Sequence, residues 1–180
     1  MELTLYTDYS LRVLMYLGLR RSELSLISEV ADDYGISANH LMKVVHGLAR
    51  GGFIRTYRGK GGGVTLAREP QDINIGAVVR YTEGEFKPVE CFRGVDNRCV
   101  VTDVCRLAGV LQEACDSFLA TLDRYSLGDL LIEPAKLRRH LGLRSAQSGR
   151  AKRTASPPSS RAIHSPLFKS QPSTERVRRG

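Results

Sequence analysis

Two glycine breaks near the start of the chain constrain its fold most strongly, because each falls where a helix must end. Apolar residues before Gly35, and again before Gly51, recur at steps of three and four, which is the spacing of one face of an α-helix. Ser25 could cap the first of these helices, and Gly35 ends it. Ile36 and Ser37 then form a tight turn. The order of helix, short glycine-containing turn and helix predicts a helix-turn-helix.

Two short β-like runs follow this motif. They cover Phe53–Tyr57 and Val64–Leu66, and the basic, glycine-rich run 58–63 joins them as a flexible hairpin. A basic hairpin placed after the second helix is a wing. Residues 1–84 are therefore predicted to form a winged helix-turn-helix domain.

Three further helices are expected. The first runs to about Arg20, and either Thr7 or Asp8 could cap it. A short helix covers Ile73–Tyr81. A long helix begins at Val104, where steps of three and four give an apolar seam suited to pairing with a second copy of the chain. The seam comprises Val104, Leu107, Leu111, Cys115, Phe118, Leu122 and Tyr125.

The predicted fold class is mainly α with a small β-hairpin wing. It combines the winged helix-turn-helix domain with a long dimerisation helix over residues 104–131. Residues 145–180 are rich in Ser, Pro, Arg and Lys and poor in apolar residues, so a disordered basic tail is expected there.

Basic side chains gather on the helix-turn-helix and the wing. The formal net charge of +8 says little by itself, because the basic residues of the tail account for most of it. Between Tyr34 and Arg68, however, the chain has no acidic residue. A local excess of positive charge without acids is the footprint of a surface that contacts phosphates.

The second helix of the motif is expected to enter the major groove by its N-terminal end. Asn39 could bind an adenine edge, and His40 or Lys43 a guanine edge or a phosphate. Lys60 at the wing tip could reach a minor groove. The candidate DNA-binding residues are Ser37, Ala38, Asn39, His40, Lys43, Arg55, Arg58 and Lys60. The alternative, a basic face that binds another protein, is weaker because the motif, the wing and the acid-free surface agree.

Three cysteines, Cys91, Cys99 and Cys105, lie in one polar segment, residues 85–106. Thiolates bind iron–sulfur clusters or zinc. The spacings here, C-x7-C and C-x5-C, lack the C-x2-4-C knuckles of structural zinc and favour a larger group, an iron–sulfur cluster. Cys115 could supply a fourth ligand, although its place on the apolar seam favours core packing. Unliganded, buried thiols are a poor alternative in so polar a segment.

Other functional classes find no support. The chain has no membrane-length apolar run and its first residues do not resemble a signal peptide, so a cytoplasmic protein without membrane contact is expected. The glycine run of the wing lacks the spacing of a phosphate-binding loop. We find no nucleophile–base pair, and we expect no enzyme.

Taken together, these segments resemble the bacterial winged-helix repressors that carry iron–sulfur clusters. The resemblance covers about residues 1–131 and is closest to the branch that senses nitric oxide. It is carried by L-T-L-Y-T-D-Y-S-L-R, Y-G-I-S-A-N-H-L-M-K-V-V-H-G-L, R-G-K-G-G-G-V-T-L-A, V-V-R-Y-T-E-G, V-E-C-F, C-V-V-T-D-V-C-R-L and F-L-A-T-L-D-R-Y-S-L-G-D-L.

The resemblance implies a homodimer in which Cys91, Cys99 and Cys105 hold a [4Fe-4S] or [2Fe-2S] cluster. It also implies that Asp8 of the partner subunit supplies the fourth ligand, and Glu85 and Glu90 remain alternatives because they flank the segment.

The expected function is a transcriptional repressor that binds a double-stranded DNA operator and leaves it when its cluster meets nitric oxide, which would derepress nitric oxide detoxification genes. Two alternatives stay open. One is a regulator of the same fold that responds to iron, redox state or cluster supply. The other is a cluster-free DNA-binding regulator that uses its thiols or zinc.

Overall fold

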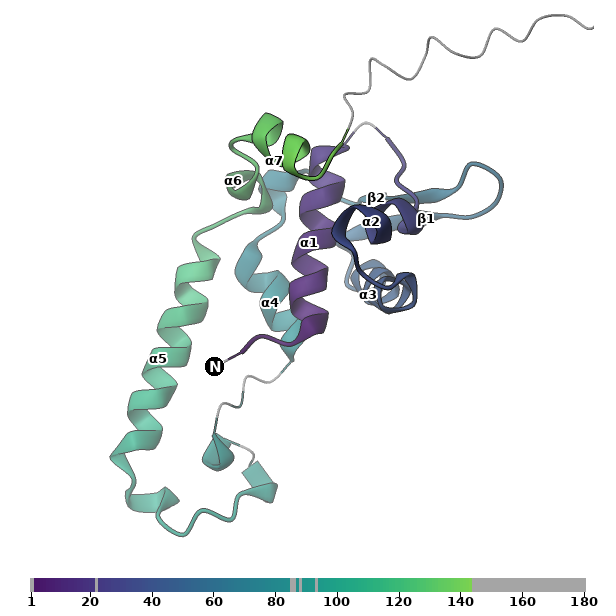
Figure 1. The fold of residues 1–180 in the computed structure, drawn as a ribbon. Coiled ribbons are helices and arrows are strands. Elements are labelled where there is room, and N and C mark those ends of the chain that lie inside the picture. The colour runs from purple at the N-terminus through teal and green to yellow at the C-terminus, as the bar shows by residue number, and fades with distance from the viewer. Residues whose placement is uncertain (1, 22, 85–86, 88, 93, 144–180) are drawn as a thin grey trace, which may run out of the picture. The chain divides into compact units, whose positions relative to one another are not determined.

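Helices dominate the part of the chain that the computed structural model describes, which is residues 2–21, 23–84, 87, 89–92 and 94–143 (Figure 1). The α-helices are α1 (Leu5–Leu19), α2 (Ile27–Tyr34), α3 (Ala38–Arg50), α4 (Ile75–Glu83), α5 (Arg106–Asp123), α6 (Leu127–Leu130) and α7 (Pro134–His140). The strands are β1 (Ile54–Tyr57) and β2 (Gly63–Leu66), and short 3-10 turns lie at Pro70–Asp72, Glu90–Phe92, Gly94–Asp96 and Thr102–Val104. The expected tail, residues 145–180, lies outside the described residues.

The core is built around α1, whose Val13, Leu14 and Leu17 are buried. This helix begins earlier than expected. Its N-cap is Thr4, whose side chain accepts a hydrogen bond from the backbone N–H of Thr7, so neither Thr7 nor Asp8 caps it. α1 packs against α3, α4, α6 and β2, and thereby joins the helix-turn-helix to the rest of the chain.

The helix-turn-helix and the wing form as predicted. Gly35 ends α2 in the left-handed region, with φ 65°, where a glycine is favoured. Ser25 does not cap α2; it forms an isolated bridge with Val64 instead, and Glu29 caps the helix by accepting from the backbone N–H of Leu26 at 3.0 Å. β1 and β2 pair antiparallel, with Ile54 opposite Leu66.

A clamp of polar contacts joins α4 and its N-cap Asn74 to the end of α5, and the two helices run side by side (Figure 1). Arg80 makes a double ion pair with Asp123, at 2.5 and 2.6 Å. The Asn74 amide donates to the backbone carbonyl of Asp123 at 2.7 Å. Beyond the clamp, Leu127 is fully buried and its backbone N–H donates to the carbonyl of Ile73 at 2.8 Å.

The helix expected over residues 104–131 is shorter than predicted, because α5 ends at Asp123 and the next residues form the separate helix α6. The apolar seam also divides. Cys115 is buried, and Leu122 packs against the core of its own chain. Val104 and Leu107, by contrast, are 82% and 60% exposed. Part of the seam therefore stabilises the monomer fold.

A polar network around Tyr16 ties α1 to α2. The Tyr16 hydroxyl donates to Asp33 at 2.7 Å and accepts from Arg20 at 3.2 Å. Burial, and then the hydrogen bond to Asp33, raise the pKa of Tyr16 to about 12.

This pKa shift predicts a loss of stability in alkali. Between about pH 10 and pH 12 the unfolded chain releases the Tyr16 proton and the folded chain keeps it, so the free energy of unfolding should fall as pH rises, by up to about 2 kcal/mol. Below pH 10 both states keep the proton and this contribution is constant. Urea unfolding from pH 8 to pH 11.5 checks this. Tyr16→Phe should show a flatter pH profile, and equal profiles would contradict the assignment.

No helix among the described residues combines the length and the apolar character needed to cross a membrane.

Candidate functional site

The N-terminal half of α3 presents the predicted base-reading residues on one exposed face. Leu41, Val44, Val45 and Leu48 are buried, which fixes the rotation of the helix about its axis. The residues that this rotation leaves exposed include Ser37, Ala38, Asn39, His40 and Lys43, together with Met42, which the sequence reasoning had not included. The first turn of α3 carries no acidic residue. Such an end suits contact with an anionic duplex.

The wing adds a second group of exposed cations. Arg55 lies on β1, while Arg58 and Lys60 lie in the hairpin loop, and all three side chains are exposed. Gly59 and Gly61 in the same loop have φ of 94° and 85°, a conformation that other residues adopt at a cost. The loop therefore keeps its tight turn while it offers Lys60 to solvent.

His40 and Lys43 also contact α1. They line a hollow of about 180 Å³ with Leu5, Tyr6, Tyr9 and Val44. The rings of Tyr9 and His40 lie 6.5 Å apart, centroid to centroid. Two candidate DNA contacts thus lie beside the first helix.

The cysteine segment follows α4 and is held by short polar contacts. Asn97 accepts from the backbone N–H of Cys99 at 2.9 Å and donates to Thr102 at 2.8 Å. Thr102 in turn donates to the carbonyl of Cys99 at 2.8 Å. Glu90, one of the alternative ligands, accepts from the backbone N–H of Arg98 at 3.1 Å. Asn97 and Thr102 are supporting residues that the cysteine spacing alone did not indicate.

The three thiols of the segment are suited to binding a soft metal. Cys91, Cys99 and Cys105 are free and half-buried, and Cys105 is the N-cap residue of α5. The N-terminal end of a helix favours negative charge, such as that of a thiolate. Cys115 is buried in α5, as expected of a packing residue. The donor set therefore fits an iron–sulfur cluster.

The structure does not bring the predicted ligands together. Among the described residues, no three His, Cys, Asp or Glu side chains are close enough to share a metal ion. Asp8 lies in the first turn of α1 and forms an ion pair with Arg12 at 2.7 Å. Glu85 lies outside the described residues.

Two tyrosines that the sequence reasoning did not single out meet on α3 at Gly47. The hydroxyl of Tyr81, on α4, donates to the Gly47 carbonyl at 3.0 Å. The hydroxyl of Tyr6, on α1, lies where a Cβ atom of residue 47 would stand. Burial, and then the proximity of Tyr81, raise the pKa of Tyr6. Gly47 is therefore a point where three helices approach each other closely.

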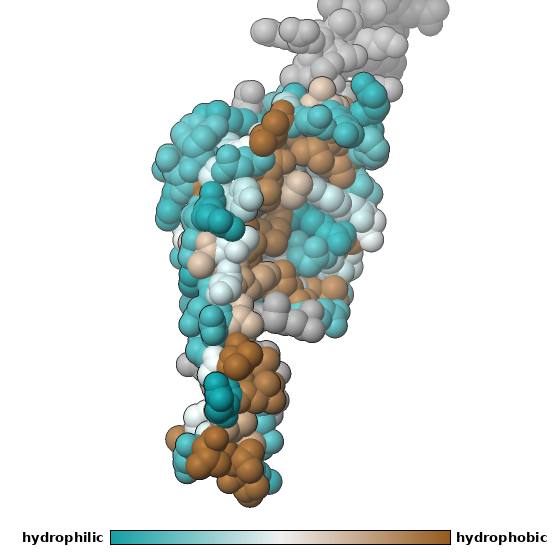
Figure 2. Space-filling model, turned by 90° about the vertical axis from the view of Figure 1, so that its left-hand side faces the viewer, coloured by the Kyte–Doolittle hydropathy of each residue, from teal (hydrophilic) through white to brown (hydrophobic). Residues whose placement is uncertain are grey.

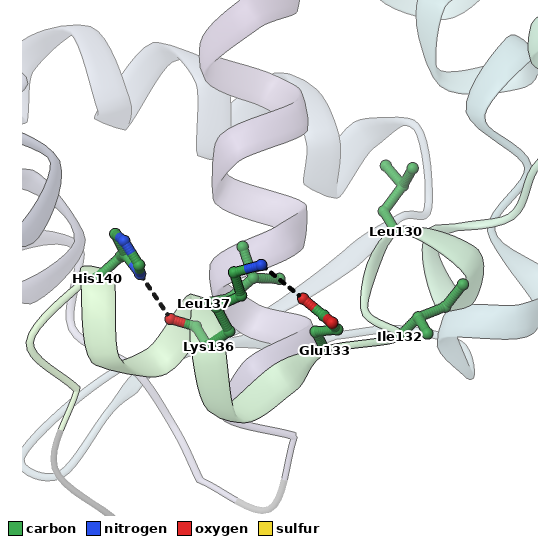
Figure 3. A pocket seen from close by; sticks show the side chains of 6 residues that line it. All are labelled: Leu130, Ile132, Glu133, Lys136, Leu137 and His140. Carbon is green, nitrogen blue, oxygen red and sulfur yellow. Dashed lines mark hydrogen bonds and ion pairs between the residues drawn. The ribbon is translucent and has the colours of Figure 1, made fainter.

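A separate hollow of about 450 Å³ lies at α6 and α7 (Figure 3). Its lining residues are Leu130, Ile132, Glu133, Lys136, Leu137 and His140. Lys136 pairs with Glu133 at 3.1 Å, and His140 contacts the Lys136 carbonyl at 3.0 Å. These polar groups contact each other in α7 and at its N-cap Glu133, and none belongs to the predicted sites.

Comparison with known proteins places residues 3–133 within a family model described as Rrf2, iron-dependent transcriptional regulator. The chain is 54% identical over 132 residues to the HTH-type transcriptional regulator NsrR of Bacillus subtilis (strain 168). This match covers 73% of this chain and 90% of that protein. It is 46% identical over 142 residues to NsrR of Bacillus licheniformis, covering 78% of this chain and 99% of that protein. These relatives are regulators of transcription rather than enzymes, in agreement with the sequence.

Solved structures show the same fold. IscR of T. potens matches with a TM-score of 0.61 at 22% identity, over 77% of this chain and 91% of that one. CymR, described as the global cysteine regulator of B. subtilis, matches with a TM-score of 0.56 at 24% identity, over 72% of this chain and 95% of that one. Both likenesses confirm the mainly helical fold with a small hairpin wing.

Proposed function

Because the chain belongs to the Rrf2 family of transcriptional regulators, we propose that it is a homodimeric repressor whose iron–sulfur cluster senses nitric oxide. The observation that carries this proposal is the set of three free, half-buried cysteines in the segment directly after the winged helix-turn-helix. The relatives named NsrR support it, together with the sequence resemblance to nitric oxide sensors.

DNA binding rests on α3 and the wing. The exposed residues at the start of α3 read base edges, and the wing cations contact phosphates. Arg55, Arg58 and Lys60 lie on one hairpin, so the wing follows the duplex beside the groove that α3 enters.

Lys60→Ala is expected to weaken binding to all duplex sequences alike. Each phosphate contact releases about one counterion, so the slope of log affinity against log salt should fall by about 1. Fluorescence anisotropy at several salt concentrations measures this slope. Lys136→Ala is the matched control, because Lys136 is an exposed lysine on α7 that pairs with Glu133. An unchanged slope in Lys60→Ala would place the wing away from the phosphates.

The thiolates of Cys91, Cys99 and Cys105 would hold the cluster, with Asp8 of the partner subunit as the fourth ligand. When bound, the cluster would supply iron, to which nitric oxide can bind. Carboxylate oxygen is a harder donor than thiolate, so Asp8 would be the most weakly held of the four ligands. Asp8 is held by Arg12, so Arg12 can retain the carboxylate once it is released. Release would change the position of α1, against which His40 and Lys43 lie.

The homodimer is proposed to form along the exposed part of the α5 seam. Figure 2 shows apolar side chains gathered in a stripe on the face it displays. The exposed apolar residues of α5 and the turn before it are Val101, Val104, Leu107 and Val110. An exposed stripe of this kind suits burial against a second copy.

Anaerobic purification followed by nitric oxide titration tests the function. We expect visible absorbance near 400 nm, and loss of affinity for duplexes selected by the protein from a random library as nitric oxide is added. Release of the duplex on addition of an iron chelator or ferricyanide, but not of nitric oxide, would favour the alternative of an iron- or redox-responsive regulator. The family description, iron-dependent transcriptional regulator, supports that alternative. Colourless, iron-free protein that binds DNA regardless of nitric oxide would contradict the proposal.

A further inference from the structure

The last turn of α4 contacts α3 through the side chain of Tyr81. Its hydroxyl donates to the Gly47 carbonyl at 3.0 Å, and this carbonyl also accepts from the backbone N–H of Gly51 at 2.9 Å. The Tyr81 ring packs edge-on against Phe53, with centroids 5.5 Å apart. A Cβ at Gly51 would stand 2.8 Å from the Tyr81 ring. α3 thus carries small residues where Tyr81 meets it.

Gly47 also meets Tyr6 of α1, whose hydroxyl occupies the place of a Cβ atom at this residue. A glycine inside a helix costs roughly 0.5–1 kcal/mol relative to alanine. Gly47 is explained by this close approach, because any larger residue would displace the Tyr6 hydroxyl. The hydroxyl groups of both tyrosines therefore meet α3 at the same residue, Gly47.

Both tyrosines lie next to the segments that carry the proposed ligands. Tyr81 is in the helix that leads directly into the cysteine segment, and Tyr6 is two residues before Asp8. The ends of these helices are also joined to each other. Thr7 donates to Thr82 at 2.8 Å, and the backbone N–H of Thr4 donates to Glu83 at 2.8 Å.

We propose that Tyr81 is a positioning residue that couples the state of the cysteine segment to recognition helix α3 through its hydrogen bond to Gly47. This inference rests on the proposed function. When the cysteine segment is held in place by a bound cluster, the end of α4 keeps the Tyr81 hydroxyl on the Gly47 carbonyl and so fixes α3 against the core. When the segment is released, α4 can withdraw this hydroxyl, and α3 loses a contact that opposes its movement. The coupling is reciprocal, so bound DNA also favours the held segment.

Tyr81→Phe tests this role, because it removes the hydroxyl and keeps the ring. The measured quantity is the ratio of affinities for a selected duplex before and after nitric oxide treatment of anaerobically purified protein. One hydrogen bond corresponds to about a three- to tenfold change in such a ratio, and we expect Tyr81→Phe to bring the ratio closer to one by that factor. Tyr34→Phe, at a tyrosine of α2 whose ring packs against Tyr16, should leave the ratio unchanged.

Reciprocity supplies a second readout. In the wild-type protein, saturating duplex should slow the loss of visible absorbance to an iron chelator, and in Tyr81→Phe this protection should shrink. An unchanged affinity ratio and unchanged protection in Tyr81→Phe would overturn the role of Tyr81 while the proposed function stands. A Tyr81→Phe protein without visible absorbance would also overturn it, because Tyr81 would then hold the segment. Wild-type protein whose affinity ignores nitric oxide would overturn the proposed function, and this inference with it.

Discussion

Protein carrying Cys99→Ala is expected to lose its visible absorbance and its bound iron completely when purified without oxygen. Cys99 lies in the middle of the cysteine segment, where Asn97 and Thr102 fix its backbone on both sides. A cluster that lacks one of three thiolates has no equivalent soft donor nearby, because the remaining cysteine, Cys115, is buried in α5. Cys91→Ala and Cys105→Ala should have the same effect.

The matched control is Cys115→Ala, which removes a thiol outside the proposed ligand set. It should keep the full absorbance and iron content, with a modest loss of stability from the small cavity that it leaves. Iron analysis and native mass spectrometry of the four variants make the comparison. A fully coloured Cys99→Ala protein would remove Cys99 from the ligand set, and a colourless Cys115→Ala protein would add Cys115 to it.

Leu41→Ala is expected to destabilise the protein by about 2–5 kcal/mol and to abolish DNA binding near physiological temperature. Leu41 is completely buried at the start of α3, so its loss opens a cavity beneath the residues proposed to read the bases. Met42→Ala is the control, because Met42 is the next residue and is 52% exposed. It should change the free energy of unfolding by less than about 1 kcal/mol. Urea unfolding compares the two, and similar losses would show that the packing of Leu41 contributes little.

Local chemistry made the helix-turn-helix and the wing predictable, because glycine fixed the ends of α2 and of the hairpin. The helix starts were less certain for a physical reason. Thr4, Thr7 and Asp8 can all cap a helix, and the side chain that does so is decided by how α1 docks on α4. Ser25 likewise forms a bridge to β2 instead of capping α2, which is a tertiary contact.

The α5 seam shows another limit of sequence periodicity. Steps of three and four indicate an apolar face, but they do not indicate whether its partner is the same chain or a second copy. The structure assigns Cys115 and Leu122 to the chain's own core and leaves Leu107 exposed. The ion pair of Arg80 with Asp123, which joins α4 to the end of α5, is between residues far apart in the sequence.

The sequence indicated which residues are candidates for the site, but it did not indicate how they lie relative to one another. Exposure of Asn39, Lys43 and Lys60 agrees with the expectation of an outward face. The contact of Tyr81 with Gly47 was not foreseen, because tyrosine and glycine are common and only the fold places them together.

Because Leu127 is buried in the core, the helix-turn-helix and wing are not expected to fold without the residues that follow the cysteine segment. This leucine comes after the cysteine segment and α5, yet it fills the core beside α1, and Leu131 of the same stretch contacts Gly18. A chain truncated after residue 84 would uncover that part of α1 and would be poorly folded. The cysteine segment and the helix-turn-helix therefore belong to one folding unit, in which the segment is an insertion within the fold rather than an attachment at its end.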